Sequence, residues 1–214
     1  MTKAEAQKRI LKLKDQINDY RYHYHVLNES TMSEAAADSL KHELSQLEGA
    51  FPELITPDSP SQRVAGEPIQ GFTKVTHSQR MLSLNDVFDD AEMAAWFSRI
   101  RKIIPDLKEV FFADLKMDGL ACALIYEDGQ LVRAVTRGDG YVGEDVTHNV
   151  RTIQSVPLKL HGICPSQLEV RGEIVMYKDD FERLNADRRE AGLEEFKNPR
   201  NLAAGTIRQL DPQL

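Results

Sequence analysis

Apolar residues near the start of the chain recur at steps of three and four, the spacing of one face of an α-helix. The positions that share this face are Ile10, Leu13, Ile17, Tyr20, Tyr24 and Leu27. After a turn at 28–31, a second helix carries its apolar positions at the same spacing, at Leu40, Leu44 and Leu47. The pattern predicts an αα hairpin, followed by a proline-rich linker over 52–71 that is ordered against its neighbours.

A third helix is predicted to begin near Asp89, where Glu92 three residues later supplies the partner of a capping box. Its apolar stripe is expected to be buried and comprises Met93, Trp96, Phe97 and Ile100. Pro105 lies beyond the end of this helix.

Apolar runs further along the chain predict strands over 110–116, 120–127, 130–137 and 167–176. The turn pair Asp128-Gly129 between the second and third runs is a strong hairpin signal. A helix capped by Asp179 or Asp180 follows and runs to about residue 191, and a short helix is predicted over 201–209. Hairpin-linked strands with helices around them predict an α+β fold with a largely antiparallel sheet.

The composition limits the classes of protein and of partner. The 214 residues carry 27 Lys+Arg and 34 Asp+Glu, a net charge of −7, so contact with nucleic acid would need a local basic patch. The two cysteines, Cys122 and Cys164, lack metal-ligand spacing, and Cys122 falls in an apolar strand where a small buried thiol is expected. No apolar stretch approaches a membrane span and no signal-peptide pattern is present, which predicts a soluble, cytoplasmic protein.

Lys116, Asp118 and Gly119 follow the first apolar run as Lys-Met-Asp-Gly. An ammonium buried at a strand end is costly, and the usual relief is loss of its proton. A lysine that is neutral near neutral pH is a nucleophile for carbonyl or phosphoryl centres. Asp118, two residues on, points to the same side of an extended chain. Taken alone, the motif also fits an ordinary turn at a strand end.

The third run leads into a glycine-rich stretch, Arg137-Gly138-Asp139-Gly140, and then Gly143-Glu144-Asp145. Charged residues between glycines indicate backbone held close to a polar ligand, although a glycine-rich hairpin turn has the same composition. Glu173 lies in a strand-like run, Val-Arg-Gly-Glu-Ile, where a carboxylate is seldom buried without a partner. It is either a functional group or half of a salt bridge within the sheet.

Together these stretches resemble the NAD-dependent DNA ligases of bacteria. The matching blocks, in the family's order and spacing, are Asp-Leu-Lys-Met-Asp-Gly-Leu-Ala, Thr-Arg-Gly-Asp-Gly, Gly-Glu-Asp-Val-Thr, Asn-Val-Arg-Thr-Ile, Glu-Val-Arg-Gly-Glu and Asn-Pro-Arg-Asn-Leu-Ala-Ala-Gly. The resemblance implies a helical domain with its linker over 1–71, which binds nicotinamide mononucleotide (NMN), and an incomplete nucleotidyltransferase (adenylation) domain over 72–214. It also implies NAD and magnesium as cofactors, nicked duplex DNA as partner, a role in DNA replication and repair, and a monomer.

By the same resemblance, Lys116 is the catalytic nucleophile, which forms a lysyl-AMP phosphoramidate from NAD and releases NMN. The residues expected around the nucleotide are Ser83, Leu84, Asp114, Asp118, Arg137 and Glu173, with Glu173 also a candidate magnesium ligand. Asp114 replaces the glutamate that the family usually has against the adenine edge. Ser83 and Leu84 match the family's Ser-Leu-Asp-Asn element, whose last two residues are exchanged here.

The helical hairpin would bind the NMN half of NAD. The candidate residues are Tyr24, His25, Glu34 and Asp38, because the family carries a Tyr-His pair and an Asp-x-x-Tyr-Asp cluster. Tyr24 also belongs to the apolar face of the first helix, so periodicity alone supports either role. Glu34 is a conservative replacement. Ala37, in contrast, stands where the family has tyrosine, which removes an aromatic surface from this site.

Arg200 and Arg208 match arginines that meet the DNA backbone around the nick in the family. On a continuous helix they lie within roughly 80° of each other, and a plain solvated face is the competing interpretation. The family's later lysine-bearing strands, oligonucleotide-binding fold, zinc module, helix-hairpin-helix repeats and BRCT domain have no counterpart before Leu214. We therefore expect the N-terminal fragment of a longer ligase, with zinc only in the missing part, and no nick sealing by this chain alone.

Two other functions stay open at this point. A non-catalytic nucleotide- or DNA-binding relative would account for the lost tyrosine at Ala37. An ATP-using nucleotidyltransferase is the second, and the Tyr24-His25 pair argues against it. Transfer of an adenylate from NAD to Lys116 would distinguish the ligase from the non-catalytic relative.

Overall fold

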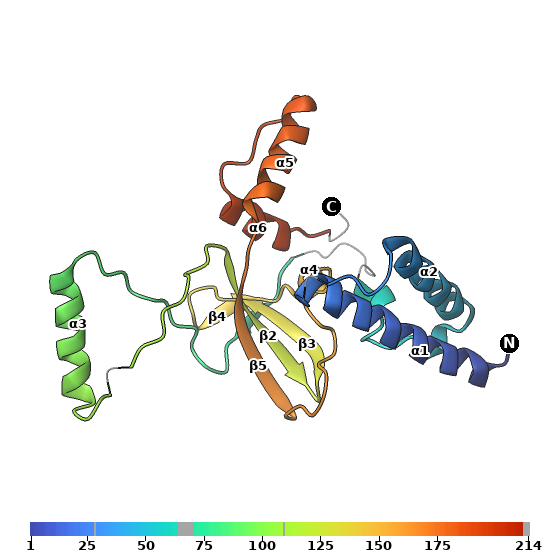
Figure 1. Ribbon diagram of the computed structural model, residues 1–214, viewed down its shortest axis with the longest axis horizontal. Helices are drawn as coiled ribbons and strands as arrows, with labels where there is room; N and C mark the ends of the chain where they lie inside the picture. The colour runs from blue at the N-terminus through green and yellow to red at the C-terminus, as the bar shows by residue number, and fades with distance from the viewer. Residues whose placement is uncertain (28, 64–70, 109, 212–214) are drawn as a thin grey trace.

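The computed structural model describes residues 1–27, 29–63, 71–108 and 110–211, without the side chains of residues 25, 26 and 34. A helical hairpin lies beside a domain built on two antiparallel sheets (Figure 1). The α+β class and the antiparallel pairing predicted from the sequence are confirmed. Within the described residues, no helix combines the length and the apolarity needed to cross a membrane.

Helices α1 (Lys3–Tyr22) and α2 (Glu34–Ala50) form the hairpin around one apolar core. The buried side chains of this core are Ile10, Leu13, Ile17 and Leu44, with Leu40, Leu47 and Leu54 packed against them. Thr2 and Glu5 form a capping box at the start of α1, and Ser33 caps α2. The apolar spacing in the sequence therefore placed both helices correctly.

The buried face of α1 ends earlier than the sequence pattern predicts. After Tyr22 the chain continues as a π-helical turn, η1 (His23–Leu27), whose wider turn shifts the following side chains out of phase with α1. Tyr24 and Leu27 are consequently 38% and 43% exposed. Their assignment to the buried face was wrong for this reason.

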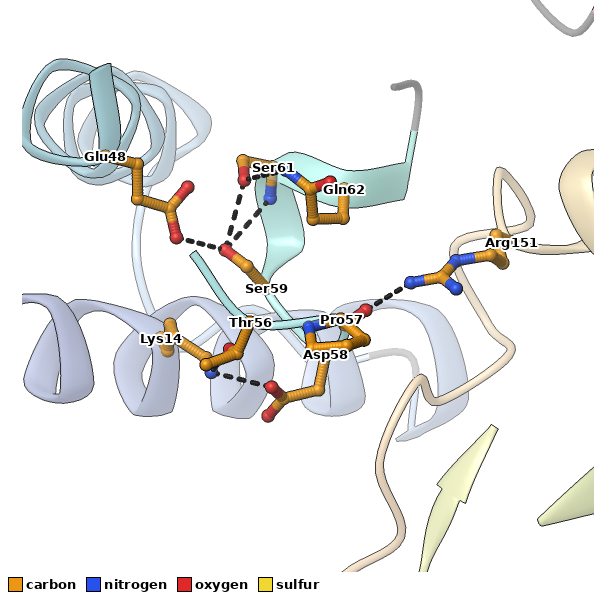
Figure 2. A network of polar contacts seen from close by, with 9 residues as sticks. All are labelled: Lys14, Glu48, Thr56, Pro57, Asp58, Ser59, Ser61, Gln62 and Arg151. Atoms are coloured by element: carbon orange, nitrogen blue, oxygen red, sulfur yellow. Dashed lines mark hydrogen bonds and ion pairs between the residues drawn. The ribbon is translucent and has the colours of Figure 1, made fainter. Parts of the chain in front are cut away.

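The linker was predicted over 52–71, of which positions 64–70 lie outside the described residues. Residues 52–63 are ordered by buried polar contacts (Figure 2). They contain the 3₁₀ helices η2 (Pro52–Leu54) and η3 (Pro60–Arg63). Lys14 Nζ lies 2.9 Å from Asp58 Oδ1, and Ser59 Oγ donates to Glu48 Oε1 at 2.6 Å. These contacts tie this part of the linker to both helices of the hairpin.

Two arginines join the linker to the sheet domain. Arg63 donates to the backbone carbonyls of Arg151, Ile153 and Val156 at 2.8–3.0 Å. Arg151 in turn donates to the Pro57 carbonyl (Figure 2). Burial, with other arginines nearby, lowers the pKa of Arg63 to about 9. The hairpin is thus connected to the domain that follows it through backbone acceptors.

The larger sheet has the strand order β3-β2-β5, formed by β2 (Leu120–Glu127), β3 (Gln130–Thr136) and β5 (Gln167–Ile174). The predicted β2–β3 hairpin is present, and Asp128 and Gly129 both have positive φ, of 48° and 77°, as its tight turn requires. A smaller sheet pairs β1 (Lys74–Thr76) with β4 (Val142–Glu144).

Short helices close the core of this domain. Helix α4 (Thr147–Val150) and helix α6 (Pro199–Ile207) contribute Val150 and Ile207 to a cluster with Cys122, Ala134 and Val146. Burial raises the pKa of the Cys122 thiol to about 12. The small buried thiol expected from the sequence is thus present in this core.

Helix α5 (Lys178–Glu190) extends away from the sheet beyond α6 (Figure 1). Its cap was mispredicted, because Tyr177 precedes the helix while Asp179 and Asp180 lie in its first turn. The carboxylates there still suit the positive end of the helix dipole.

Helix α3 (Asp90–Ile103) stands apart from the sheets (Figure 1). Asp89 caps it as predicted, accepting from Glu92 N at 2.8 Å. None of its residues is buried, so the predicted buried stripe was wrong. Trp96 and Phe97 instead contact Phe111, at centroid distances of 6.0 and 5.3 Å, which leaves these rings partly covered by one another.

Residues 110–116 do not form the predicted strand. They have no regular secondary structure and no ladder partner among the described residues, and Val110, Phe112 and Leu115 are 85%, 91% and 82% exposed. A short apolar run indicates burial but does not name the surface that would bury it. The run therefore predicted an environment that these residues do not have here.

Candidate nucleotide pocket

A pocket of about 730 Å³ opens where the two sheets, the segment 81–84, the segment 115–119 and α6 come together. The predicted site residues that line it are Ser83, Leu84, Lys116, Asp118, Arg137, Glu173, Arg200 and Arg208. Candidates for nucleotide and for DNA contact, far apart in the sequence, thus surround the same cavity.

Lys116 lies in the exposed segment that precedes β2, and its side chain is not buried. The expectation of a lysine buried at the end of a strand is therefore wrong, because the run before it has no covering layer among the described residues. The place of Lys116 in the pocket wall remains as the structural support for its role.

The Lys-x-Asp-Gly turn is fixed against β5. Gly119 N donates to Glu173 Oε1 at 3.2 Å. A Cβ on Gly119 would lie only 2.1 Å from the Ile174 carbonyl oxygen, so this close approach of backbones requires glycine. The turn that carries Lys116 and the carboxylate of Glu173 consequently have a set position relative to each other.

Ion pairs line the side of the pocket formed by α6. Arg200 Nη1 lies 2.9 Å from Asp118 Oδ1, and Arg208 Nε lies 2.9 Å from Glu144 Oε2. Lys74 Nζ lies 2.9 Å from the other oxygen of Glu144. The hydrogen bond from Lys74, helped by Arg208, lowers the pKa of Glu144 despite its partial burial.

Both arginines line the pocket, but α6 ends at Ile207 and Arg208 is its C-cap residue, so the continuous helix assumed for their spacing is not present. The spacing also did not reveal their carboxylate partners. Glu144 belongs to the glycine-rich stretch in which the sequence indicated a nearby ligand, but the sequence assigned no role to Glu144 itself. Lys74 gave no signal, since β1 has only three residues.

Arg137 and Ser83 form another part of the wall, with Arg137 Nη1 at 3.2 Å from Ser83 Oγ. Gly138 follows with φ of 56°, and a Cβ there would lie 1.9 Å from the Val142 carbonyl oxygen. The chain can turn back toward β4 only because this position is glycine. The glycine-rich stretch therefore sets the backbone position from which the Arg137 side chain extends.

Some predicted site residues are not brought to this pocket. Asp114 is exposed, is not among the lining residues, and accepts from Leu115 N at 2.7 Å. Tyr24 and Asp38 lie on the hairpin, where Tyr24 stacks on Tyr20 at 5.5 Å and Asp38 pairs with Lys41 at 2.9 Å. The side chains of His25 and Glu34 lie outside the described part of the structure.

Ala37, which replaces the family's tyrosine, is 2% exposed. The alanine side chain is therefore covered by its surroundings in the described structure.

Glu173 is the carboxylate that could hold magnesium. Among the described residues, no group of three His, Cys, Asp or Glu side chains forms a ready metal site. Mg²⁺ usually keeps several waters and binds one or two carboxylates together with substrate phosphates. Glu173, one of the carboxylates at the pocket wall, fits that limited role.

Comparison with known proteins identifies the family to which this chain is similar. Residues 69–214 match the family model of the NAD-dependent DNA ligase adenylation domain, and residues 3–65 match that of the DNA ligase-like, N-terminal NAD+-binding domain. A DNA ligase of Halorhodospira halophila is 50% identical over 214 residues, which are 100% of this chain and 30% of the relative. DNA ligases of Thermomicrobium roseum and Coxiella burnetii are 51% and 47% identical, with 98% and 99% of this chain and 31% and 32% of the relatives covered.

The chain thus spans about a third of the length of the curated relatives that it matches. Since the adenylation-domain model alone covers more than half of the sequence, the chain belongs to the NAD-dependent DNA ligase family.

Proposed function

We propose that this chain carries the self-adenylylation step of an NAD-dependent DNA ligase that joins nicks in duplex DNA during replication and repair. The observation that carries the proposal is the meeting of Lys116, Arg137 and Glu173 in one pocket of a chain from this family. Because the relatives are about three times longer, joining of DNA is proposed for the whole protein.

In the proposed reaction, the neutral Lys116 Nζ attacks the adenylyl phosphorus of NAD. A P–N bond forms, the P–O bond to NMN breaks, and NMN leaves with the electron pair. Two protons leave the nitrogen, one before the attack and one after it. The Arg137 fork suits the charge that develops on the phosphate oxygens. Bound magnesium, held through Glu173, would neutralise part of the same charge.

The pairing of Asp118 with Arg200 supports a positioning role for Asp118. Its carboxylate is held on the α6 side of the pocket, two residues from Lys116. We propose that this pair keeps the turn before β2 open to the phosphate. Ser83 and Leu84 would then contact the adenosine half, and Asp114 would reach the adenine edge only if the segment before Lys116 closes over it.

The hairpin is proposed as the site for the NMN half of NAD, in a division of the chain into 1–71 and 72–214. Tyr24 offers a partly exposed ring, and Asp38 lies on the exposed face of α2. We propose His25 and Glu34 as their partners. A monomer in the bacterial cytoplasm, where the chromosome lies, is proposed with this function.

The test is adenylate transfer to the chain, followed by intact-protein mass spectrometry after incubation with NAD and magnesium. We expect one added AMP on the unmodified protein. The Lys116→Arg variant should gain none, because a guanidinium stays protonated and cannot attack. Transfer from ATP but not NAD would contradict the choice of donor, and AMP on another residue would contradict the choice of nucleophile. No transfer at all would favour the non-catalytic relative.

A further inference from the structure

The segment 77–84 brings Ser83 and Leu84 to the pocket, although it contains no helix or strand. Such a segment holds a precise position only if other elements fix it. Arg171 of β5 does so from one side, because its Nη1 donates to the Arg80 carbonyl at 2.9 Å and its Nη2 donates to the Gln79 carbonyl at 2.5 Å. A planar guanidinium can hold two successive carbonyls in this way, whereas an ammonium cannot reproduce the fork.

Glu169, two residues earlier on the same face of β5, orients this guanidinium. Arg171 Nε donates to Glu169 Oε1 at 2.6 Å, and Ser78 Oγ donates to Glu169 Oε2 at 2.8 Å. Partial burial alone would raise the pKa of Glu169, but the hydrogen bonds from Arg171 and Ser78 outweigh it and lower the pKa. The ionised carboxylate therefore binds both Arg171 and the segment itself.

The loop after β3 holds the same segment from the other side. Met81 N donates to the Gly140 carbonyl at 2.9 Å, and His77 N donates to the Tyr141 carbonyl at 2.8 Å. The Arg80 guanidinium lies over the Tyr141 ring, 4.6 Å from its centroid. The segment is consequently positioned against both β5 and the loop that begins at Arg137.

We infer that Glu169 and Arg171 are positioning residues, which set the segment 77–84 so that Ser83 meets Arg137 at the nucleotide pocket. The inference rests on the proposed function, because only the proposed function makes this pocket a binding site for NAD. Arg171 directs both Nη atoms at carbonyls of the segment and its Nε at Glu169, so it acts through Ser83 and Leu84. Loss of either residue would weaken binding of NAD and would leave the reacting groups themselves in place.

The experiment uses the full-length protein and the variants Glu169→Ala and Arg171→Lys. We expect each to raise the KM for NAD about tenfold, the equivalent of ~1.4 kcal/mol, with kcat changed less than about twofold. Glu169→Gln should stay within about threefold of the unmodified protein, because its amide can still accept from Arg171 and donate to Ser78. Arg183→Ala removes an exposed arginine that pairs with Asp180 and serves as the matched control.

A second measurement does not depend on activity. Amide hydrogen exchange over residues 77–84 should become faster in Glu169→Ala and Arg171→Lys, and should stay unchanged in Arg183→Ala. Unchanged exchange there would overturn the inference. A fall in kcat accompanied by a fall in the temperature of unfolding, without a selective rise in the KM for NAD, would also overturn it. Failure of the proposed function is recognised separately, as absence of adenylate on the unmodified protein.

Discussion

Arg208 Nε lies 2.9 Å from Glu144 Oε2 at the pocket wall, so an arginine expected to meet the DNA backbone is held by a carboxylate of its own chain. Lys74 occupies the other oxygen of that carboxylate at 2.9 Å. A DNA phosphate would therefore compete with Glu144 for Arg208. This competition gives the DNA contact a measurable cost and makes it testable.

Arg208→Ala should make binding of the full-length protein to a nicked duplex less sensitive to salt. If Arg208 leaves Glu144 for a phosphate, the slope of log affinity against log salt should fall by about one. Glu144→Gln should strengthen binding at low salt, since it releases Arg208. The measurement is a salt series of binding isotherms, with Arg183→Ala as control. An unchanged slope in Arg208→Ala would show that the ion pair persists on DNA.

Asp58→Asn should destabilise the fold, because Lys14 and Asp58 are 8% and 9% exposed and Lys14 would lose its carboxylate partner, although its hydrogen bond to the Thr56 hydroxyl would remain. Breaking a buried pair on one side typically costs about 3 kcal/mol, measurable by urea unfolding. The double variant Lys14→Met/Asp58→Leu replaces both charges and should recover most of the loss. Equal destabilisation in both variants would mean that packing, rather than the uncompensated charge, is responsible.

The same pair gives a pH dependence with a definite sign. Partial burial would raise the pKa of Asp58, but hydrogen bonds from Thr56 and Lys14 outweigh it and lower the pKa. The ionised carboxylate therefore stabilises the folded state above the unfolded pKa of about 3.9, and this stability is lost as the pH falls through the lower folded pKa. Unfolding free energies measured from about pH 5 down to 2 should fall less steeply in Asp58→Asn than in the unmodified protein.

Ala37→Tyr should lower stability rather than restore an aromatic surface for NMN. Ala37 is 2% exposed, and forcing a larger side chain into a packed position costs about 1–3 kcal/mol. Ala35→Tyr, at an exposed position of the same helix, should change stability by less than about 0.5 kcal/mol. A lower KM for NAD in Ala37→Tyr at unchanged stability would show instead that a tyrosine fits there as in the family.

The 214-residue chain alone should not seal nicked DNA. The cations that line its pocket are Lys74, Lys116, Arg137, Arg171, Arg200 and Arg208. Four of these are paired with carboxylates, which leaves Lys116 and Arg137 to meet phosphate charge among the described residues. Charge stabilisation and positioning supply much of the catalysis in such reactions, and the net charge of −7 disfavours DNA binding. The assay is nick closure with NAD and magnesium at low salt. Closure by residues 1–214 would contradict this account.

Local signals in the sequence predicted most of the framework. The spacing of Leu13 and Ile17 fixed α1, and Asp128-Gly129 fixed the β2–β3 turn, because these features depend on neighbouring residues only. The run at 110–116 failed because burial depends on another layer, which apolar composition does not identify. The predicted burial of Tyr24 was wrong because a π-helical turn shifts the phase of the helical face, and the sequence carries no clear signal of that turn.

The candidate site shows the same division. Resemblance to the family nominated Lys116 and Arg137, and the structure places both at one pocket. The contacts of Arg208 with Glu144 and of Arg171 with the carbonyls of the segment 77–84 could not be predicted. Each joins positions more than sixty residues apart, so it depends on how strands and α6 are placed in space.

The close approaches at Gly119, Gly138 and Gly143 limit how the sequence around this pocket can vary. A Cβ at any of these positions would lie 1.8–2.1 Å from a carbonyl oxygen of a neighbouring strand or turn. Even alanine would separate the backbones that hold Lys116 and Arg137 in place. In a library in which every residue is varied, these positions should retain only glycine. The sequence requirements of this site therefore include positions that must lack a side chain, in addition to the charged residues that would act on the nucleotide.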